Sequence, residues 1–267
     1  EFRPGQAQIV DHVVAGRDAL VIMPTGGGKS LCFQIPALVR PGLAVIVSPL
    51  IALMKDQVDT LRANGVAAAC LNSSVPREEL LGIYSALRQG ELKLLYVAPE
   101  RLMVPDFLDQ LAELRLSLFA IDEAHCISQW GHDFRPEYAQ LGCLKQRFPH
   151  IPLLALTATA DEATRQDILA RLGQSDPLVH LASFDRPNIR YSLLDKYKPN
   201  EQLASYIDKQ SGQCGIVYCT SRSRTEEVAK FLRGRGVRAA CYHAGLPVQE
   251  RGSVQEAFLR DDIEVVV

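Results

Sequence analysis

The stretch Ala19-Leu20-Val21-Ile22-Met23-Pro24-Thr25-Gly26-Gly27-Gly28-Lys29-Ser30 decides the fold of this chain. Its first half is a short apolar run of the kind that forms a buried strand, and its second half is rich in glycine. Three consecutive glycines allow a tight turn in which main-chain N–H groups point at phosphate oxygens. A helical pattern follows at residues 31–38. The stretch therefore has the strand, loop and helix order of a phosphate-binding loop.

Within this loop, Lys29 can reach the β- and γ-phosphates of a nucleoside triphosphate, and the Ser30 hydroxyl can ligate Mg²⁺. The strict pattern has glycine six residues before the lysine, where this chain has Met23. A glycine-rich stretch by itself could also be a flexible surface turn, but the flanking strand and helix favour the nucleotide site. The predicted nucleotide-binding residues of the loop are Thr25, Gly26, Gly27, Gly28, Lys29 and Ser30.

A second motif, Asp122-Glu123-Ala124-His125, follows another apolar run. Asp122 suits a second contact to Mg²⁺, and Glu123 can orient and deprotonate an attacking water. Together with the loop, these residues predict an ATPase site in which Lys29, Asp122 and Glu123 are catalytic.

Composition is that of a globular protein. The chain has 267 residues, of which 47% are hydrophobic and 22% charged, and this excludes a disordered chain. The net charge of −2 means that any nucleic-acid binding must come from a local basic surface. The seven cysteines include no C-x-x-C pair, which favours reduced thiols. We find neither a signal peptide nor a membrane-spanning run, so a cytoplasmic protein is expected.

Apolar runs alternate with helical patterns along the first two thirds of the chain, which predicts βαβ units and a parallel sheet with helices on both faces. In such folds the functional loops gather at the carboxyl ends of the strands. Strands are expected at residues 19–23, 43–47, 92–97, 116–121 and 153–156, and helices at residues 31–38, 50–64, 76–88, 137–147 and 163–172.

The pattern changes at residues 183–200, where Pro, Asn and charged residues are concentrated, and a second α/β pattern follows. It comprises a strand at 215–219, a helix begun by a capping box Ser223-x-x-Glu226, a strand at 239–243 and a helix at 248–258. We expect a first domain at 1–182, a linker at 183–200 and an incomplete second domain at 201–267. Both chain ends indicate a fragment of something longer.

Several motifs resemble those of the bacterial RecQ DNA helicases of superfamily 2, and the resemblance extends over essentially the whole chain. The most specific is Cys126-Ile127-Ser128-Gln129-Trp130-Gly131-His132-Asp133-Phe134-Arg135-Pro136, which is similar to the aromatic-rich loop of that family. The others are Phe2-Arg3-Pro4-Gly5-Gln6, Met23 to Ser30, Ser48 to Gln57, Tyr96 to Arg101, Asp122-Glu123-Ala124-His125 and Leu156 to Ala160.

The resemblance implies a RecA-like domain followed by a truncated second RecA-like domain. It implies an ATP-dependent, 3′-to-5′ DNA helicase of DNA recombination and repair, using ATP and Mg²⁺ on single-stranded and duplex DNA. Zinc is expected only in the C-terminal region of the whole protein, which is expected to lie in the bacterial cytoplasm at the nucleoid. A single-strand-binding protein is a possible partner. This stretch alone is expected to hydrolyse ATP poorly, because the family's arginine finger would follow it.

The resemblance also assigns roles to single residues. Gln6, with Arg3, would read adenine. Trp130 and Phe134 would stack on an unpaired base, an interaction that tolerates any sequence. His125, His132 and Arg135 would carry a signal from bound DNA to Glu123. A zinc site made of His125, Cys126 and His132 is dismissed, because the spacing is wrong and a fourth ligand is missing.

Further residues are predicted to grip the DNA backbone or to couple that grip to ATP. Ser48-Pro49 and Asn72-Ser73 offer groups that bind phosphates, although either pair could equally cap a helix. Thr157 and Thr159 resemble the family's coupling motif. In the second domain the expected DNA contacts are Ser221, Arg222 and His243.

Two alternatives stay open. The first is an RNA-remodelling ATPase of the DEAD-box type, against which stand His125 in place of Asp and the loop around Trp130. The second is a DNA-binding module without catalysis, against which stand Lys29 and Glu123. Comparing stimulation by DNA and by RNA separates the first, and nucleotide titration separates the second.

Overall fold

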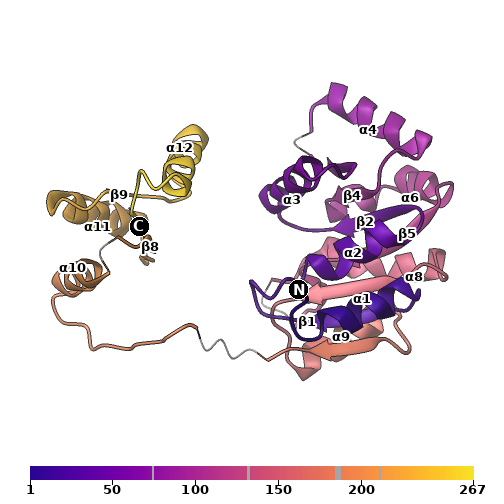
Figure 1. The fold of residues 1–267 in the computed structure, drawn as a ribbon, viewed down its shortest axis with the longest axis horizontal. Coiled ribbons are helices and arrows are strands. Elements are labelled where there is room, and N and C mark those ends of the chain that lie inside the picture. Colours follow the sequence, from indigo (N-terminus) through magenta and orange to yellow (C-terminus); the bar gives the residue numbers. More distant parts are fainter. Residues whose placement is uncertain (74, 131–132, 184–187, 211) are drawn as a thin grey trace. The chain divides into compact units, whose positions relative to one another are not determined.

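The computed structural model describes residues 1–73, 75–130, 133–183, 188–210 and 212–267. The chain forms two compact units, Glu1–Asn188 and Ile189–Val267, which are described separately below (Figure 1). The helices of the first unit are α1 (Gln6–Val14), α2 (Leu31–Val39), α3 (Ile51–Ala63), α4 (Arg77–Gln89), α5 (Pro99–Leu102), α6 (Pro105–Ala112), α7 (Pro136–Ala139), α8 (Cys143–Arg147) and α9 (Glu162–Leu172).

The first unit is built on a seven-stranded sheet of order β3-β4-β2-β5-β6-β1-β7, in which every pair of neighbours is parallel. The expected α/β class is therefore confirmed. The central strands are completely buried, as in sheets that helices cover on both faces. The strands are β1 (Ala19–Ile22), β2 (Leu43–Val47), β3 (Ala68–Leu71), β4 (Leu94–Val97), β5 (Leu116–Ile121), β6 (Leu153–Thr157) and β7 (Leu178–Leu181).

Two hydrophobic cores lie on the two faces of this sheet. Alternate strand residues face opposite sides. Val21 therefore belongs to the core that includes residues of α1, α2 and α3, whereas Leu20 belongs to the core that includes residues of α4, α6 and the helices of residues 136–172. The strand ends are level, because Ile22 pairs with Thr157 and Val47 pairs with both Val97 and Ile121. The loops after β1, β2, β4, β5 and β6 therefore leave the sheet at one edge.

Several elements of the first unit differ from the sequence prediction, which did not include the helices α1, α5 and α6. Strands β3 and β7 were not predicted, since β3 is rich in small residues and β7 is a half-buried edge strand. The single helix expected at 137–147 is wrong. It is broken into α7, a 3₁₀ turn at Gln140–Gly142 and α8. A Cβ on Gly142 would lie 2.2 Å from the main-chain oxygen of Arg171, so this segment packs directly on the end of α9.

The second unit has a three-stranded parallel sheet of order β8-β10-β9, made of β8 (Gly215–Ile216), β9 (Ala239–Ala240) and β10 (Val265–Val266). Its helices are α10 (Pro199–Lys209), α11 (Arg222–Gly234) and α12 (Val248–Leu259). A small core gathers around Val228, Leu232 and Val265. Among the described residues, no helix has both the length and the apolar character needed to cross a bilayer.

The predicted capping box of α11 is wrong. Ser223 lies inside the first turn of that helix, and Ser221 is the residue that precedes it. Ser221 has extended backbone angles, and its hydroxyl accepts the N–H of Arg224 at 3.2 Å. An extended residue directly before the first turn is where a side-chain oxygen can reach an unpaired helix N–H.

Candidate nucleotide-binding and coupling site

The phosphate loop leaves the end of β1 and enters α2. Gly26 and Gly28 have φ values of 77° and 85°, which are accessible to glycine without strain. The Lys29 ammonium donates to the main-chain oxygens of Met23 at 3.0 Å and of Pro24 at 3.5 Å. Because these acceptors belong to the loop itself, the lysine charge lies at the loop, where a bound phosphate would compete for it.

Gln6 and Arg3, both predicted to bind adenine, are attached to the main chain of the phosphate loop. Gln6 is 1% exposed. Its amide nitrogen donates to the oxygen of Gly28 at 3.1 Å, and its Oε1 accepts the N–H of Arg3 at 2.7 Å. The Arg3 guanidinium donates to the oxygen of Gly26. Arg3 and the first residue of α1, Gln6, thus hold the main chain of the loop, and reading of adenine by Gln6 stays a prediction.

Asp122 follows β5 and is 7% exposed. Burial, and then the negative charge of Glu123, raise its pKa to about 6, although the Glu123 N–H and the charges of Lys29 and His125 oppose the shift. A buried carboxyl beside a second carboxylate is stabilised in its charged form by a nearby cation. The residues therefore fit the predicted Mg²⁺, with Asp122 as one ligand and the Ser30 hydroxyl, at the start of α2, as the other.

Glu123 has a strained main chain, with φ of 50° and ψ of 44°. The left-handed region costs a residue with a side chain about 1–2 kcal/mol, and such strain is concentrated at functional sites. Its Oε2 lies 3.3 Å from His125 Nδ1, and its side chain is partly exposed. The unusual turn therefore presents the predicted base at the carboxyl edge of the sheet, beside the imidazole.

The His125 imidazole joins Glu123 to the end of β6. Its Nδ1 also lies 2.9 Å from Thr157 Oγ1. The Thr157 hydroxyl donates to the oxygen of Thr159 at 3.2 Å and accepts the Thr159 N–H at 3.3 Å. With the Thr157 hydroxyl assigned as donor to the Thr159 oxygen, this pattern of hydrogen bonds assigns Oγ1 as acceptor toward His125 and the proton to Nδ1. Glu123, His125, Thr157 and Thr159 thus form one continuous chain of polar contacts.

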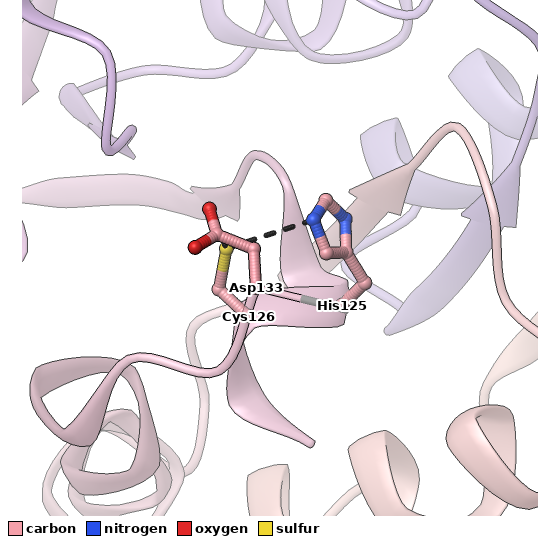
Figure 2. Close-up of side chains that lie close together, drawn as sticks. All are labelled: His125, Cys126 and Asp133. Atoms are coloured by element: carbon pink, nitrogen blue, oxygen red, sulfur yellow. Dashed lines mark hydrogen bonds between the residues drawn. The ribbon is translucent and has the colours of Figure 1, made fainter. Parts of the chain in front are cut away.

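The other side of the same imidazole faces Cys126 and Asp133 (Figure 2). Cys126 Sγ lies 3.7 Å from His125 Nε2 and 3.8 Å from Asp133 Oδ2. Arg135 donates to the same Oδ2 at 3.0 and 3.3 Å, and its main-chain N–H donates to the oxygen of Cys126 at 3.0 Å. The Arg135 guanidinium, predicted to signal toward Glu123, therefore binds Asp133. The main-chain N–H of Arg135 closes the aromatic-rich loop at Cys126.

The aromatic-rich loop presents Trp130 at the surface. Trp130 is 77% exposed, and its main-chain N–H donates to Ser128 Oγ at 3.2 Å. An exposed indole on a braced turn is suited to stacking on a base, and it is not a core residue. Phe134 is half-buried. His132 lies outside the described residues.

Tyr138 contributes to the site but was missed in the sequence. Its ring is fully buried, and its hydroxyl donates to the main-chain oxygen of Asp122 at 3.0 Å. Burial is the main reason that its pKa lies well above the usual range. The bond fixes the turn from Asp122 into Glu123. The sequence did offer a signal for this role. Tyr138 follows Pro136 by two residues, at the start of a segment that was expected to be a helix packed on the core.

The residues predicted to grip the DNA backbone lie at the ends of β2 and β3. Pro49, Asn72 and Ser73 line one cavity of about 610 Å³, together with Glu100 and Arg101 after β4. Ser48 is 2% exposed, its hydroxyl lies beneath the surface, and it is not among the residues that line this cavity, so its contact with DNA stays a prediction. Its N–H continues the ladder to Val97, which keeps the residue in the sheet.

In the second unit, Ser221, Arg222 and His243 line a cavity of about 660 Å³ at the ends of β8 and β9. His243 Nε2 lies 3.1 Å from Glu226 Oε1, and its Nδ1 accepts the N–H of Gly245 at 3.2 Å. The three residues predicted as DNA contacts in this unit therefore share one surface.

The DEAD/DEAH box helicase family model matches residues 3–168, and that of the helicase conserved C-terminal domain matches residues 198–267. The chain is 57% identical over 266 residues to the ATP-dependent DNA helicase RecQ of Pasteurella multocida, and 54% identical to that of Haemophilus influenzae. These matches cover 100% of this chain but only 42% and 43% of the relatives, so the chain spans about two fifths of their length.

Two solved structures share the fold. A Mycobacterium smegmatis helicase Lhr, bound to ssDNA and AMP-PNP, has a TM-score of 0.68 at 18% identity, and the match covers 100% of this chain and 39% of that one. The Pyrococcus furiosus Hef helicase domain has a TM-score of 0.66 at 13% identity, with coverage of 100% and 85%. The family match covers more than half of the sequence, and the resemblance to RecQ is confirmed by the relatives. The chain belongs to the DEAD/DEAH box helicase family.

Proposed function

We propose that this chain is the ATP-binding part of an ATP-dependent DNA helicase of the RecQ type, which moves 3′ to 5′ on single-stranded DNA and unwinds duplex DNA. The observation that carries the proposal is the polar chain from Glu123 through His125 to Thr157 and Thr159. It begins at the predicted base for ATP hydrolysis and lies beside the loop that displays Trp130. The relatives named RecQ support DNA as the substrate.

In this mechanism Lys29 leaves the loop oxygens of Met23 and Pro24 for the phosphates of ATP. The main-chain N–H groups of the loop, held in position by Gln6, bind the same phosphates. Mg²⁺, when bound by Asp122 and Ser30, would neutralise charge on the phosphates. Glu123 orients a water in line with the γ-phosphate and accepts its proton.

Coupling to DNA runs through the aromatic-rich loop. A nucleobase stacked on Trp130 would pull on the aromatic-rich loop. The contact between Cys126 and Arg135 that closes this loop adjoins His125. A shift of His125 changes its contacts with Glu123 and Thr157 together, because one nitrogen, Nδ1, serves both. We propose that this shared nitrogen is the point at which DNA binding alters the position of Glu123, the predicted general base.

Further parts of the proposal rest on family resemblance. Pro49, Asn72 and Ser73 in the first unit, and Ser221, Arg222 and His243 in the second, would hold the DNA backbone. The whole protein would act in recombination and repair in the bacterial cytoplasm, with a single-strand-binding protein as partner. The zinc site that the family resemblance implies would belong to the C-terminal region of the whole protein.

The experiment that tests the proposal is ATP hydrolysis by the whole protein, with and without single-stranded DNA, beside the same titration with RNA. Strong stimulation by DNA alone is the expected result. Stimulation by RNA alone would move the substrate to the DEAD-box alternative, and hydrolysis that ignores both would remove the coupling role of the loop. Absence of nucleotide binding would leave a DNA-binding module without catalysis.

A further inference from the structure

We propose that His125, Cys126 and Asp133 form a binding site for a borderline divalent cation such as Zn²⁺ at the base of the aromatic-rich loop (Figure 2). One ligand atom from each residue lies within 4.8 Å of the other two. The three side chains supply an imidazole, a thiol and a carboxylate, the ligand types that zinc accepts. This site is separate from the predicted Mg²⁺ ligands, Asp122 and Ser30.

The two distances from the Cys126 sulfur to the other ligand atoms match those around a tetrahedral zinc ion. With Zn–S of about 2.3 Å and Zn–N or Zn–O of about 2.1 Å, sulfur lies about 3.6 Å from each of the other ligand atoms. Cys126 Sγ is 3.7 Å from His125 Nε2 and 3.8 Å from Asp133 Oδ2. A cation could therefore bind with shifts of a few tenths of an ångström in these two distances, while the imidazole and the carboxylate, within 4.8 Å of each other, close on it. A water molecule would take the fourth position.

The imidazole is oriented as metal-binding histidines usually are. A histidine that ligates through one ring nitrogen commonly donates the other N–H to a carboxylate or hydroxyl, which fixes the tautomer and the ring direction. Here Nδ1 contacts Glu123 Oε2 at 3.3 Å and Thr157 Oγ1 at 2.9 Å, while Nε2 is the nitrogen turned toward Cys126. The outer contacts that such a ligand needs are thus present.

Sequence spacing concealed this site. The zinc site that we dismissed from the sequence took His132 as its third residue. In the structure, the third side chain of the cluster is that of Asp133. The Arg135 N–H bond to the oxygen of Cys126 returns the chain to the base of the loop, and this return brings Asp133 beside the thiol. Adjacent residues 125 and 126 supply the other two ligands from the 3₁₀ turn at Ala124–Ile127.

Binding of the cation releases one proton and competes with Arg135 for Asp133. The Cys126 thiol loses its proton to solvent as the S–metal bond forms, and no oxidation occurs. Arg135 loses all or part of its hold on Asp133, because it shares Oδ2 with the thiol. The cation then ties Asp133 to residues 125 and 126. We expect this link to reduce the stimulation of ATP hydrolysis by DNA. That consequence rests on the proposed function, whereas the binding of the metal ion does not.

The first test is titration of the 267-residue chain, under reducing conditions, with Co²⁺ as a spectroscopic substitute for Zn²⁺. We expect one ion per chain, with a thiolate-to-cobalt absorption band that added Zn²⁺ removes. Cys126→Ser should abolish the band, and Asp133→Asn should weaken binding at least about tenfold. Cys214→Ser is the matched control, since that thiol is exposed and also contacts an aspartate, Asp261 at 3.2 Å, yet belongs to no such cluster in the described residues.

The second test uses the single tryptophan of the chain, Trp130, as a reporter in the same loop. Zn²⁺ should change its fluorescence in a saturable way in the unmodified chain and in Cys214→Ser, but not in Asp133→Asn. Because Asp133 is exposed, its substitution leaves the fold intact even if Cys126→Ser does not fold. A cobalt band that survives in Cys126→Ser, or identical zinc affinity in Asp133→Asn, would overturn the site. Intact metal binding with unaltered DNA stimulation would instead reject only the regulatory consequence.

Discussion

His125 Nδ1 lies 2.9 Å from Thr157 Oγ1, and this contact joins the 3₁₀ turn after β5 to the end of β6. Both side chains are almost completely buried. The two strands are neighbours in the sheet, so their carboxyl-terminal loops are held at a constant separation. We expect a change at one loop to reach the other through this side-chain contact rather than through movement of the sheet.

Thr157→Val tests this contact, because valine keeps the shape of threonine and removes the hydroxyl. The His125 N–H then loses one of its acceptors and keeps its contact with Glu123 Oε2, which should lower the free energy of unfolding by about 0.5–1.5 kcal/mol. Nucleotide binding should persist, while stimulation of hydrolysis by DNA should fall. Thr157→Ser restores the hydroxyl and should restore the stimulation. Equal stimulation in the valine and serine variants would show that Thr157 is structural.

Glu123→Gln should leave ATP binding in place and slow hydrolysis by about 10²- to 10⁴-fold, because an amide cannot accept the proton of the attacking water. Single-turnover hydrolysis and nucleotide titration separate the two effects. Glu91→Gln, at an exposed position after α4, is the matched control and should hydrolyse ATP normally. Turnover in Glu123→Gln equal to that of the unmodified protein would remove Glu123 as the base.

Trp130→Ala should weaken binding to single-stranded DNA by about 1–3 kcal/mol and bring the DNA-stimulated rate of ATP hydrolysis down toward the rate without DNA. Trp130→Phe keeps a ring for stacking and should retain much of the stimulation. Tyr206→Ala removes another exposed aromatic side chain, on α10, and should have no effect. Full stimulation of Trp130→Ala by DNA would mean that the loop has another role.

Asp122 should make the protein less stable above neutral pH. Its folded-state pKa is raised from 3.8 to about 6, so protonation stabilises the folded state, fully below pH 3.8, and this contribution is lost as the pH rises through 6. Asp122→Asn should raise the free energy of unfolding at pH 8 by up to about 3 kcal/mol and have little effect at pH 3.5. Urea denaturation at the two pH values measures this difference. The same variant should lose Mg²⁺-dependent hydrolysis.

Gln6→Ala should weaken the binding of GTP as well as that of ATP, because Gln6 holds the main chain of the phosphate loop at Gly28. Any additional loss that is confined to ATP measures how far Gln6 reads adenine. Fluorescent analogues of the two nucleotides provide the affinities. Gln8→Ala, at an exposed position on the same helix, is the control. A variant that loses affinity for ATP alone would contradict the bracing role.

The α/β fold was predictable because its local signals agree. The apolar runs that form β1, β2, β4, β5 and β6 are bounded by glycine, proline or charged residues, and a motif follows each of them. The breaks in the prediction have tertiary causes. Gly142 interrupts a helical pattern because it packs on the main chain at Arg171. The short strand β3 exists because it pairs along β4, not because of its composition.

By itself, the sequence determined the phosphate loop, the Asp122-Glu123 pair and the aromatic-rich loop, because each depends on residue types at fixed short spacing. Only the tertiary structure decided which atoms meet. It buries Ser48, attaches Gln6 to the loop, places Tyr138 beneath Asp122 and brings Asp133 to Cys126. These contacts join residues through turns and neighbouring strands, so their geometry depends on packing, which local spacing does not specify.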